Sequence, residues 1–196
     1  MPMKHNIEKG DLLVAEPFMK DPSFKRTVTL ICEHNTEGSL GLVLSRPSIF
    51  RINEMIPNFP AFQGNVFYGG PVGMDRLNYI HAYGDLLEGA FHIKDNLYWN
   101  GNFEQLKSLI KAKKIMPQNI KFFAGYAGWE AGQLDEEMQE NSWIVCKNYP
   151  EIFKMNEYMW HDVLVKMGGK NKFVATLPED PILNHYCPIK IKKREP

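Results

Sequence analysis

The sequence predicts an α+β fold built on a mixed, largely antiparallel β-sheet with a few helices. Short runs of β-branched, aromatic and aliphatic residues, separated by glycine and proline, fill about the first hundred residues. Segments with helical spacing come mainly afterwards. Strands in runs with helices inserted late are typical of α+β proteins. With 196 residues, 44% of them hydrophobic, we predict one domain over residues 1–196, in which 178–196 form a partly packed C-terminal tail.

Strands are expected first. Proline and turn residues bound the apolar runs, and the turn residues at 35–38 join two of these runs into a hairpin. Gly41 within that hairpin indicates a bulge or a close approach of two backbones. The predicted strands of this part are 10–17, 26–34, 39–45, 65–68, 77–83, 90–93 and 96–99.

Three of the four predicted helices lie outside the 122–143 stretch. Residues 52–56 suit a short helical turn, and 102–113 suit a helix with Asn102 as its N-cap and Gln105 three residues later. A third helix is predicted from Pro150 to Met167, ending at the glycines that follow. Residues 142–146 form a strand between the last two helices.

Residues 122–143 hold the most distinctive pattern. A predicted strand over 119–126 carries two adjacent phenylalanines, Phe122 and Phe123, and is therefore covered on both faces, and glycines at 125, 128 and 132 predict a tight turn. A helix follows, with Leu134 and Met138 on its inner side and an acidic first turn. Trp129 is interpreted as a buried plug whose indole N–H needs a partner. The alternative is a binding site at Tyr126, Trp129 and Gln133.

Composition excludes several classes of protein. Lys+Arg and Asp+Glu both count 23, so no net field attracts nucleic acid or an anionic membrane. The chain shows neither an apolar run of membrane-spanning length nor a signal peptide, and we expect a cytoplasmic protein. Three scattered cysteines without CxxC spacing favour neither disulfides nor zinc. We predict no cofactor and no metal.

Three arginines stand at comparable strand borders: Arg26, Arg46 and Arg76. If their loops meet, they form an anion pocket beside the backbone amides of Gly69, Gly70 and Gly73, which the glycines would leave uncovered. The simpler interpretation is that each arginine pairs locally with a carboxylate such as Asp21, Glu33 or Asp75 and holds a loop in place.

Other chemistry is weakly indicated. Glu33 and His34 are consecutive strand residues and point to opposite faces, so they do not act as a pair. Cys32 lies in an apolar run that hides its thiol. His81 and His92 make a metal site only if the fold brings them together. Lysines of the 102–113 helix and of the tail read as solvated surface, and no helix-turn-helix pattern supports sequence-specific DNA binding.

Three stretches resemble the AlgH/YqgE family of bacterial proteins: residues 10–47, 67–77 (FYGGPVGMDRL) and 125–143 (GYAGWEAGQLDEEMQENSW). The resemblance implies coiled, branched β-sheets flanked by helices in a bacterial cytoplasmic protein. The family is often labelled as transcriptional regulators, but the resemblance supplies no DNA-binding motif and no catalytic residues.

From these patterns we expect a non-enzymatic binding or regulatory protein that takes a protein partner or a small anionic ligand. Glycines and aromatics gather in the 69–76 loop and the 126–133 corner. The candidate contact residues there are Gly69, Gly70, Asp75, Arg76, Tyr126, Trp129 and Gln133. The alternative is an enzyme whose small anionic substrate is held by Arg26, Arg46 and Arg76. The sequence does not set the oligomeric state.

Overall fold

The computed structural model describes residues 6–154 and 156–179. In this part of the chain, ten strands join in one branched sheet, with β9 (Ile120–Glu130) at the branch point. The main path runs β10-β1-β2-β3-β9-β6-β8-β7, while β5 pairs with both β9 and β4. The β5–β9 pairing is parallel and the other described pairings are antiparallel. The predicted α+β fold with a largely antiparallel sheet is confirmed.

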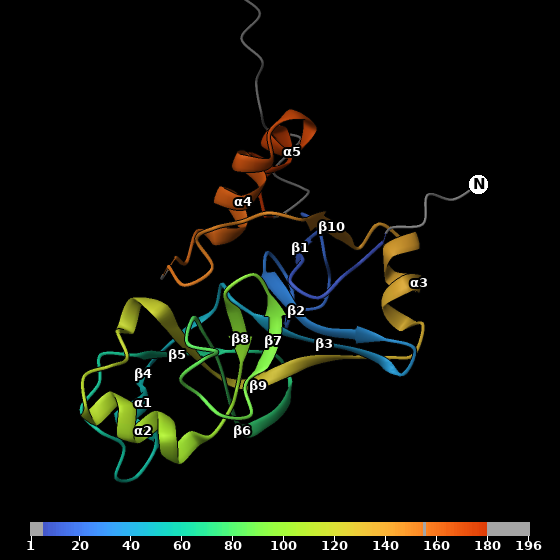
Figure 1. Ribbon diagram of the computed structural model, residues 1–196. Coiled ribbons are helices and arrows are strands. Elements are labelled where there is room, and N and C mark those ends of the chain that lie inside the picture. The colour runs from blue at the N-terminus through green and yellow to red at the C-terminus, as the bar shows by residue number, and fades with distance from the viewer. Residues whose placement is uncertain (1–5, 155, 180–196) are drawn as a thin grey trace, which may run out of the picture.

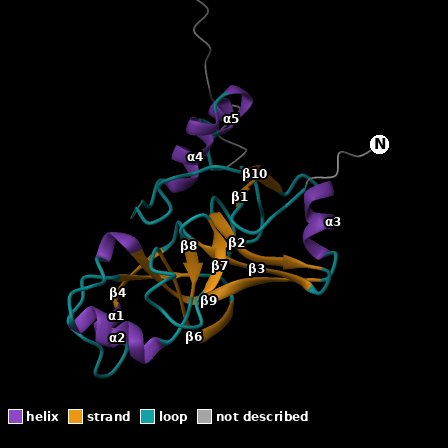
Figure 2. Cartoon of the chain, in the orientation of Figure 1, coloured by secondary structure: helices purple, strands orange, loops and turns teal. Residues whose placement is uncertain are grey.

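β9 and β6 are the longest strands. Besides β9, the strands are β1 (Leu12–Ala15), β2 (Val28–Asn35), β3 (Gly38–Val43), β4 (Pro47–Arg51), β5 (Asn65–Tyr68), β6 (Val72–His81), β7 (Phe91–Lys94), β8 (Leu97–Trp99) and β10 (Trp143–Cys146). The helices lie around the sheet (Figure 2) and are α1 (Ile52–Met55), α2 (Phe103–Lys111), α3 (Gln133–Gln139), α4 (Met159–Met167) and α5 (Gly169–Val174).

β9 belongs to two parts of the sheet because it bends at Gly125. Its first half pairs with β5 and β6, and its second half pairs with β3. Gly125 has a φ of 71°, which breaks the strict alternation of side chains at this point. As a result, Phe123 and Tyr126 both pack on one core, whereas Phe122 and Ala124 pack on another. The adjacent phenylalanines are covered on both faces, as predicted.

The turn predicted from Gly125 onwards is wrong. The strand continues to Glu130 because β3 supplies a backbone partner for every residue from Ala127 to Glu130. Only Gly132, with a φ of 81°, makes the turn into α3. Trp129 therefore lies on a strand and not in a loop. Leu134 and Met138 are buried on the inner side of α3, as their spacing predicts.

Three hydrophobic clusters form the interior. The largest lies on the face covered by α4 and the β7–β8 hairpin, the second beneath α1 and α2, and the third beneath α3. Trp160 of α4 anchors the first cluster, since its indole donates to the carbonyl of Ala15 at 2.8 Å. The side chain of Asn102 caps α2 by accepting from the Gln105 N–H at 3.0 Å, as predicted.

Other boundaries differ from the prediction. α4 begins at Met159, not at Pro150, because Asn156 accepts from the Tyr158 N–H at 2.9 Å and fixes a turn there. Gly168 ends α4, but α5 starts at the next residue. β4 was not predicted, since it starts at a proline and is an edge strand. Most of the predicted tail, residues 180–196, lies outside the described residues.

Candidate functional site

The glycine loop between β5 and β6 is fixed by its backbone. Gly69 donates its N–H to the Ala124 carbonyl at 2.8 Å, and its own carbonyl accepts from the Val43 N–H at 2.8 Å. The Gly69 amide is therefore not free to bind an anion, contrary to the prediction. Gly70 has a φ of 151°, and a Cβ there would overlap the backbone of Tyr126. Glycine is needed at Gly70 for close approach of two backbones.

Residues 73–76 form a bulge within β6. β6 pairs with β9 at Val72 and again at Leu77, opposite Tyr126 and Ala124, so the segment between has no strand partner. A Cβ on Gly73 would lie 3.1 Å from Cε1 of Tyr126 and 3.2 Å from Cδ of Arg76. The Tyr126 ring and the Arg76 side chain thus lie beside Gly73.

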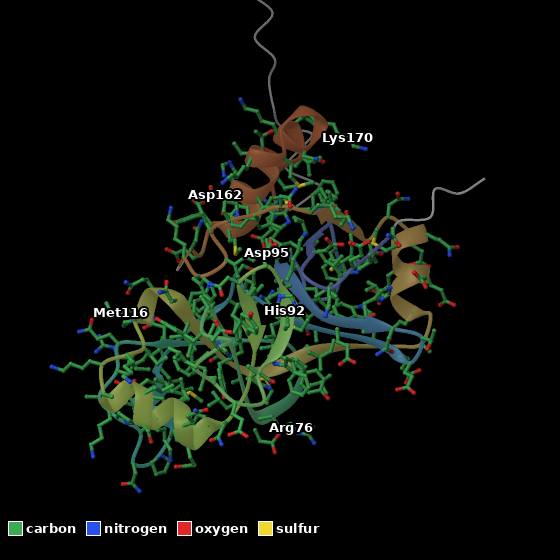
Figure 3. The ribbon with its side chains drawn as sticks, viewed as in Figure 1. Arg76, His92, Asp95, Met116, Asp162 and Lys170 are labelled. Atoms are coloured by element: carbon green, nitrogen blue, oxygen red, sulfur yellow. The ribbon has the colours of Figure 1, made fainter. Side chains whose placement is uncertain are left out.

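Exposed apolar side chains gather where β5 ends and β6 begins. Tyr68 is 43% exposed, Val72 40% and Met74 46%. Asp75 and Arg76 are exposed beside them, and Figure 3 shows Arg76 on the outer side of β6. We call Tyr68, Val72, Met74, Asp75 and Arg76, with the half-buried ring of Tyr126, the Tyr68–Arg76 surface.

The corner around Trp129 is packed. Trp129 is 5% exposed, and its ring stacks on Phe24 with centroids 6.0 Å apart. Its indole N–H donates to Glu137 at 2.9 Å. Gln133 donates to the other oxygen of that carboxylate at 3.0 Å and accepts from the Glu130 N–H. The polar groups of Trp129 and Gln133 are thus bonded within the protein, to Glu137 and the Glu130 backbone. This arrangement fits the packing interpretation better than a binding site.

Two of the three arginines hold backbone carbonyls. Arg26 donates to the Leu177 carbonyl at 2.6 Å, and its guanidinium lies 4.4 Å from the centre of the Trp160 ring. Arg46 donates to the carbonyls of Pro22 at 2.7 Å and Lys25 at 3.2 Å. Burial lowers the pKa of both guanidinium groups. They hold loops in place, as the simpler interpretation expects, but through carbonyls and not through the predicted carboxylates.

The remaining candidates are separated or enclosed. Burial raises the pKa of the Cys32 thiol, and His34 Nδ1 lies 2.7 Å from the Ser39 hydroxyl. His81 is buried, accepts from the Tyr83 N–H through Nδ1, and donates from Nε2 to the Asn100 carbonyl at 2.7 Å. Both ring nitrogens of neutral His81 are thus occupied by hydrogen bonds within the protein. Among the described residues, no three His, Cys, Asp or Glu side chains gather in a way that suits a metal ion.

Sequence reasoning missed a buried lysine. Lys121 is 3% exposed, and its Nζ donates to the Lys154 carbonyl at 3.1 Å and approaches the Leu44 carbonyl at 3.5 Å. The same atom lies 4.3 Å from the centre of the Phe67 ring. Burial lowers the pKa of Lys121 to about 7. The sequence did indicate that this lysine is buried, since Lys121 lies between Ile120 and two phenylalanines. Alternation along the strand puts its side chain on the inner face shared with Phe123.

Sequence reasoning also missed a cleft of about 540 Å³ between the β7–β8 hairpin and residues 147–153. Its residues come from distant parts of the chain, so no local pattern reveals it. It contains none of the predicted site residues.

The chain is similar to proteins of one family in both sequence and fold. A family model described as AlgH-like matches residues 12–172. A UPF0301 protein of Cytophaga hutchinsonii is 40% identical over 181 residues, covering 91% of this chain and 100% of that protein. A UPF0301 protein of Chlorobium limicola is 41% identical over 180 residues, covering 91% and 96%.

Two solved structures have the same fold. The solution structure of the AlgH protein from Pseudomonas aeruginosa matches with a TM-score of 0.69 and 30% identity, over 87% of this chain and 94% of that one. A crystal structure from Corynebacterium diphtheriae matches with a TM-score of 0.73 and 22% identity, over 89% and 94%, and at this identity shows the fold alone. Across the described part of the chain, no helix combines the length and apolarity needed to cross a bilayer.

Proposed function

The chain belongs to the AlgH-like family, and on this premise we propose that it is a non-enzymatic protein that binds a protein partner through the Tyr68–Arg76 surface. The observation that carries the proposal is the exposure of Tyr68, Val72 and Met74, each between 40% and 46%, where β5 ends and β6 begins. Grouped apolar side chains with polar neighbours are typical of protein interaction sites.

The backbone beneath this surface supports the proposal. Gly69 bonds to β3 and β9, and Gly70 lies against the backbone of Tyr126, so the apolar side chains stand on a loop that is fixed before binding. A fixed loop loses little conformational entropy on association, which favours affinity. Asp75 and Arg76 supply polar groups at the border of the apolar residues, where they would set orientation and partner choice.

A binding role fits better than the enzyme alternative. Arg26 and Arg46 each donate from one guanidinium nitrogen to backbone carbonyls of the protein, and Arg76 lies on the separate Tyr68–Arg76 surface. A small anionic substrate would need these arginines to converge. A regulatory effect would pass through the bound partner and not through DNA, because the surface carries one arginine against one aspartate and no excess of basic groups. We place this role in the cytoplasm.

Affinity capture with surface variants tests the proposal. Tagged protein is incubated with an extract of the source bacterium, and captured proteins are quantified by mass spectrometry for the wild type, Met74→Asp and Phe173→Asp. Phe173 on α5 is the control, since it is 70% exposed but far from the loop in sequence and on another element. We expect at least one partner to be lost with Met74→Asp and retained with Phe173→Asp.

A photo-crosslinking residue at Val72 then shows whether that partner touches the loop. The proposal fails if Met74→Asp captures the same proteins in the same amounts as the wild type, or if the crosslinker at Val72 never joins the captured partner. Both variants alter exposed side chains, so circular dichroism should show an unchanged fold for each.

A further inference from the structure

The cleft beside the β7–β8 hairpin has the size of a small-molecule site. It measures about 540 Å³ and lies between the hairpin and the segment that leads from β10 towards α4. Pockets of roughly 300–1,000 Å³ are typical of bound metabolites and cofactors. In Figure 3, Asp95 marks the tip of the hairpin on the side that faces β10 and α4.

One side of the cleft is apolar and aromatic. Leu97 and Tyr149 are buried members of the largest hydrophobic cluster, and Ile152 and Phe153 pack partly against it. These side chains present apolar surface to the cleft. A ligand that fills the space would therefore place an aromatic or other apolar body against Tyr149, Ile152 and Phe153.

The other side carries a positive charge without an anionic partner. Lys94 is half-buried, and its Nζ donates to the Lys147 carbonyl at 3.2 Å, but in the described chain it makes no ion pair. Lys147 also lines the cleft, but its ammonium is paired with Asp11 at 2.6 Å. Asp95 lines the cleft too, but it is exposed, whereas Lys94 is half-buried. The least compensated charge in the cleft is thus the Lys94 ammonium.

Two hydrogen bonds hold the walls of the cleft. Lys121 ties the Lys154 carbonyl, next to Phe153, to the central sheet at 3.1 Å. The Lys94 bond to the Lys147 carbonyl joins the hairpin to the opposite wall at its base. The cleft is therefore formed before any ligand enters, which favours binding of small molecules.

We propose that this cleft binds a small amphipathic anion, whose aromatic or apolar body lies on Tyr149, Ile152 and Phe153 while its acidic group contacts the Lys94 ammonium. The site is separate from the Tyr68–Arg76 surface and does not depend on it, because the two share no residue.

A pair of fluorescent probes tests the proposal. 1-Anilinonaphthalene-8-sulfonate has an aromatic body and a sulfonate, and N-phenyl-1-naphthylamine has the same body without the charge. Both are titrated into the wild type, Lys94→Met, Lys9→Met, Phe153→Ala and Met74→Asp. Lys9 is the matched control, since it also donates to a backbone carbonyl, that of His92 at 3.0 Å, but does not line the cleft.

We expect Lys94→Met to weaken sulfonate binding roughly fivefold to tenfold, the scale of a partly exposed charge-assisted contact. The same variant should leave the uncharged probe within about twofold, and Phe153→Ala should weaken both probes by comparable factors. Lys9→Met should change neither. Methionine keeps the aliphatic stem of Lys94 that packs beside Gly10, so the Lys94 variant stays folded.

Where the wild type binds the probes saturably, two results would overturn the proposal. One is sulfonate affinity that Lys94→Met does not change, or changes equally for both probes. The other is saturable binding that Met74→Asp abolishes and Phe153→Ala does not, because the probes would then be on the Tyr68–Arg76 surface. Absence of saturable binding by the wild type also overturns it.

Discussion

The indole nitrogen of Trp129 lies 2.9 Å from Oε2 of Glu137. The same carboxylate oxygen accepts from the indole of Trp143 at 2.7 Å, so one side chain of α3 satisfies two tryptophans from β9 and β10. Both rings are buried, and their planes meet at 78° with centroids 6.0 Å apart. The acidic side of α3 is thus part of how the helix is attached to the sheet.

Glu137→Leu should lower the free energy of unfolding by roughly 2–4 kcal/mol, because it leaves two buried indole N–H groups without an acceptor. Glu137→Gln keeps an acceptor oxygen and should cost only about 1 kcal/mol. Urea unfolding measures both values. Glu136→Gln on the same helix is exposed and serves as the control, with an expected change within about 0.5 kcal/mol. A loss in Glu137→Leu as small as that of the control would contradict the shared bond.

Trp129→Ala should cost on the order of 3–5 kcal/mol, since it removes a buried ring from the cluster beneath α3. Trp129→Phe retains most of that packing but loses the bond to Glu137, so an intermediate loss of about 1–2 kcal/mol is expected. Chemical denaturation of the variants provides the comparison. A loss below about 1 kcal/mol for Trp129→Ala would mean that the tryptophan is not structural.

Local patterns predicted what depends on local sequence. Phe122 and Phe123 indicated a strand covered on both faces, Asn102 indicated a helix start, and the bulky Trp129 indicated a packed corner. The extension of β9 past Gly125 was missed because β3 supplies the partners of residues 127–130 from almost 90 residues earlier. The hydrogen bonding of Gly69 was missed for the same reason, since Ala124 accepts its N–H.

The candidate sites likewise depend partly on local sequence and partly on residues far away in the chain. The sequence drew attention to the 69–76 loop, but the exposure of Tyr68, Val72 and Met74 follows from how β5 and β6 meet β9. The cleft combines residues 94–97 of the β7–β8 hairpin with residues 147–153, which are at least 50 positions away. No pattern within either segment reports that the other lies opposite.

Gly70→Ala should destabilise the protein by more than 2 kcal/mol, because a Cβ would overlap the backbone of Tyr126 in addition to the strain of a positive φ. Gly132→Ala is the matched control, since Gly132 has a φ of 81° but open space where the Cβ would lie. That variant should cost only about 1 kcal/mol. Thermal unfolding compares the two. Equal losses would show that the close approach of the two backbones contributes nothing.

Arg26→Ala should release the α4–α5 region, because Arg26 contacts both Trp160 and the Leu177 carbonyl. A loss of about 1–2 kcal/mol is expected. Hydrogen exchange should become faster for amides of α4 while α2, in another cluster, stays protected. Arg26→Lys keeps the charge but not the planar stacking, so it should recover only part of the loss. Unchanged exchange in α4 would contradict this role.

Stability should rise between pH 7 and pH 9 because of Lys121. Burial lowers the pKa of this ammonium from 10.5 to about 7, so in this window the unfolded chain binds a proton that the native protein has released. The excess of protons in the unfolded state makes the free energy of unfolding increase with pH, by at most about 1.4 kcal/mol per pH unit. Lys121 should contribute about 2 kcal/mol across the two units, measured by urea unfolding in buffers of constant ionic strength as the difference between the wild type and Lys121→Met.

Two buried thiols act in the same window and oppose part of the gain, because burial raises the pKa of Cys32 and of Cys146 while the unfolded thiols ionise at about pH 8.5. The pKa of His81 is lowered by burial, so its contribution lies below pH 7, and the raised pKa values of Tyr79 and Tyr149, each to about 12, reduce stability only as unfolded tyrosine ionises near pH 10. Lys121→Met should therefore abolish most of the gain between pH 7 and pH 9. Lys111→Met, at an exposed position of α2, should leave it intact. Parallel pH profiles for Lys121→Met and the wild type would show that Lys121 remains charged in the folded protein, held by the carbonyls of Lys154 and Leu44 and the ring of Phe67.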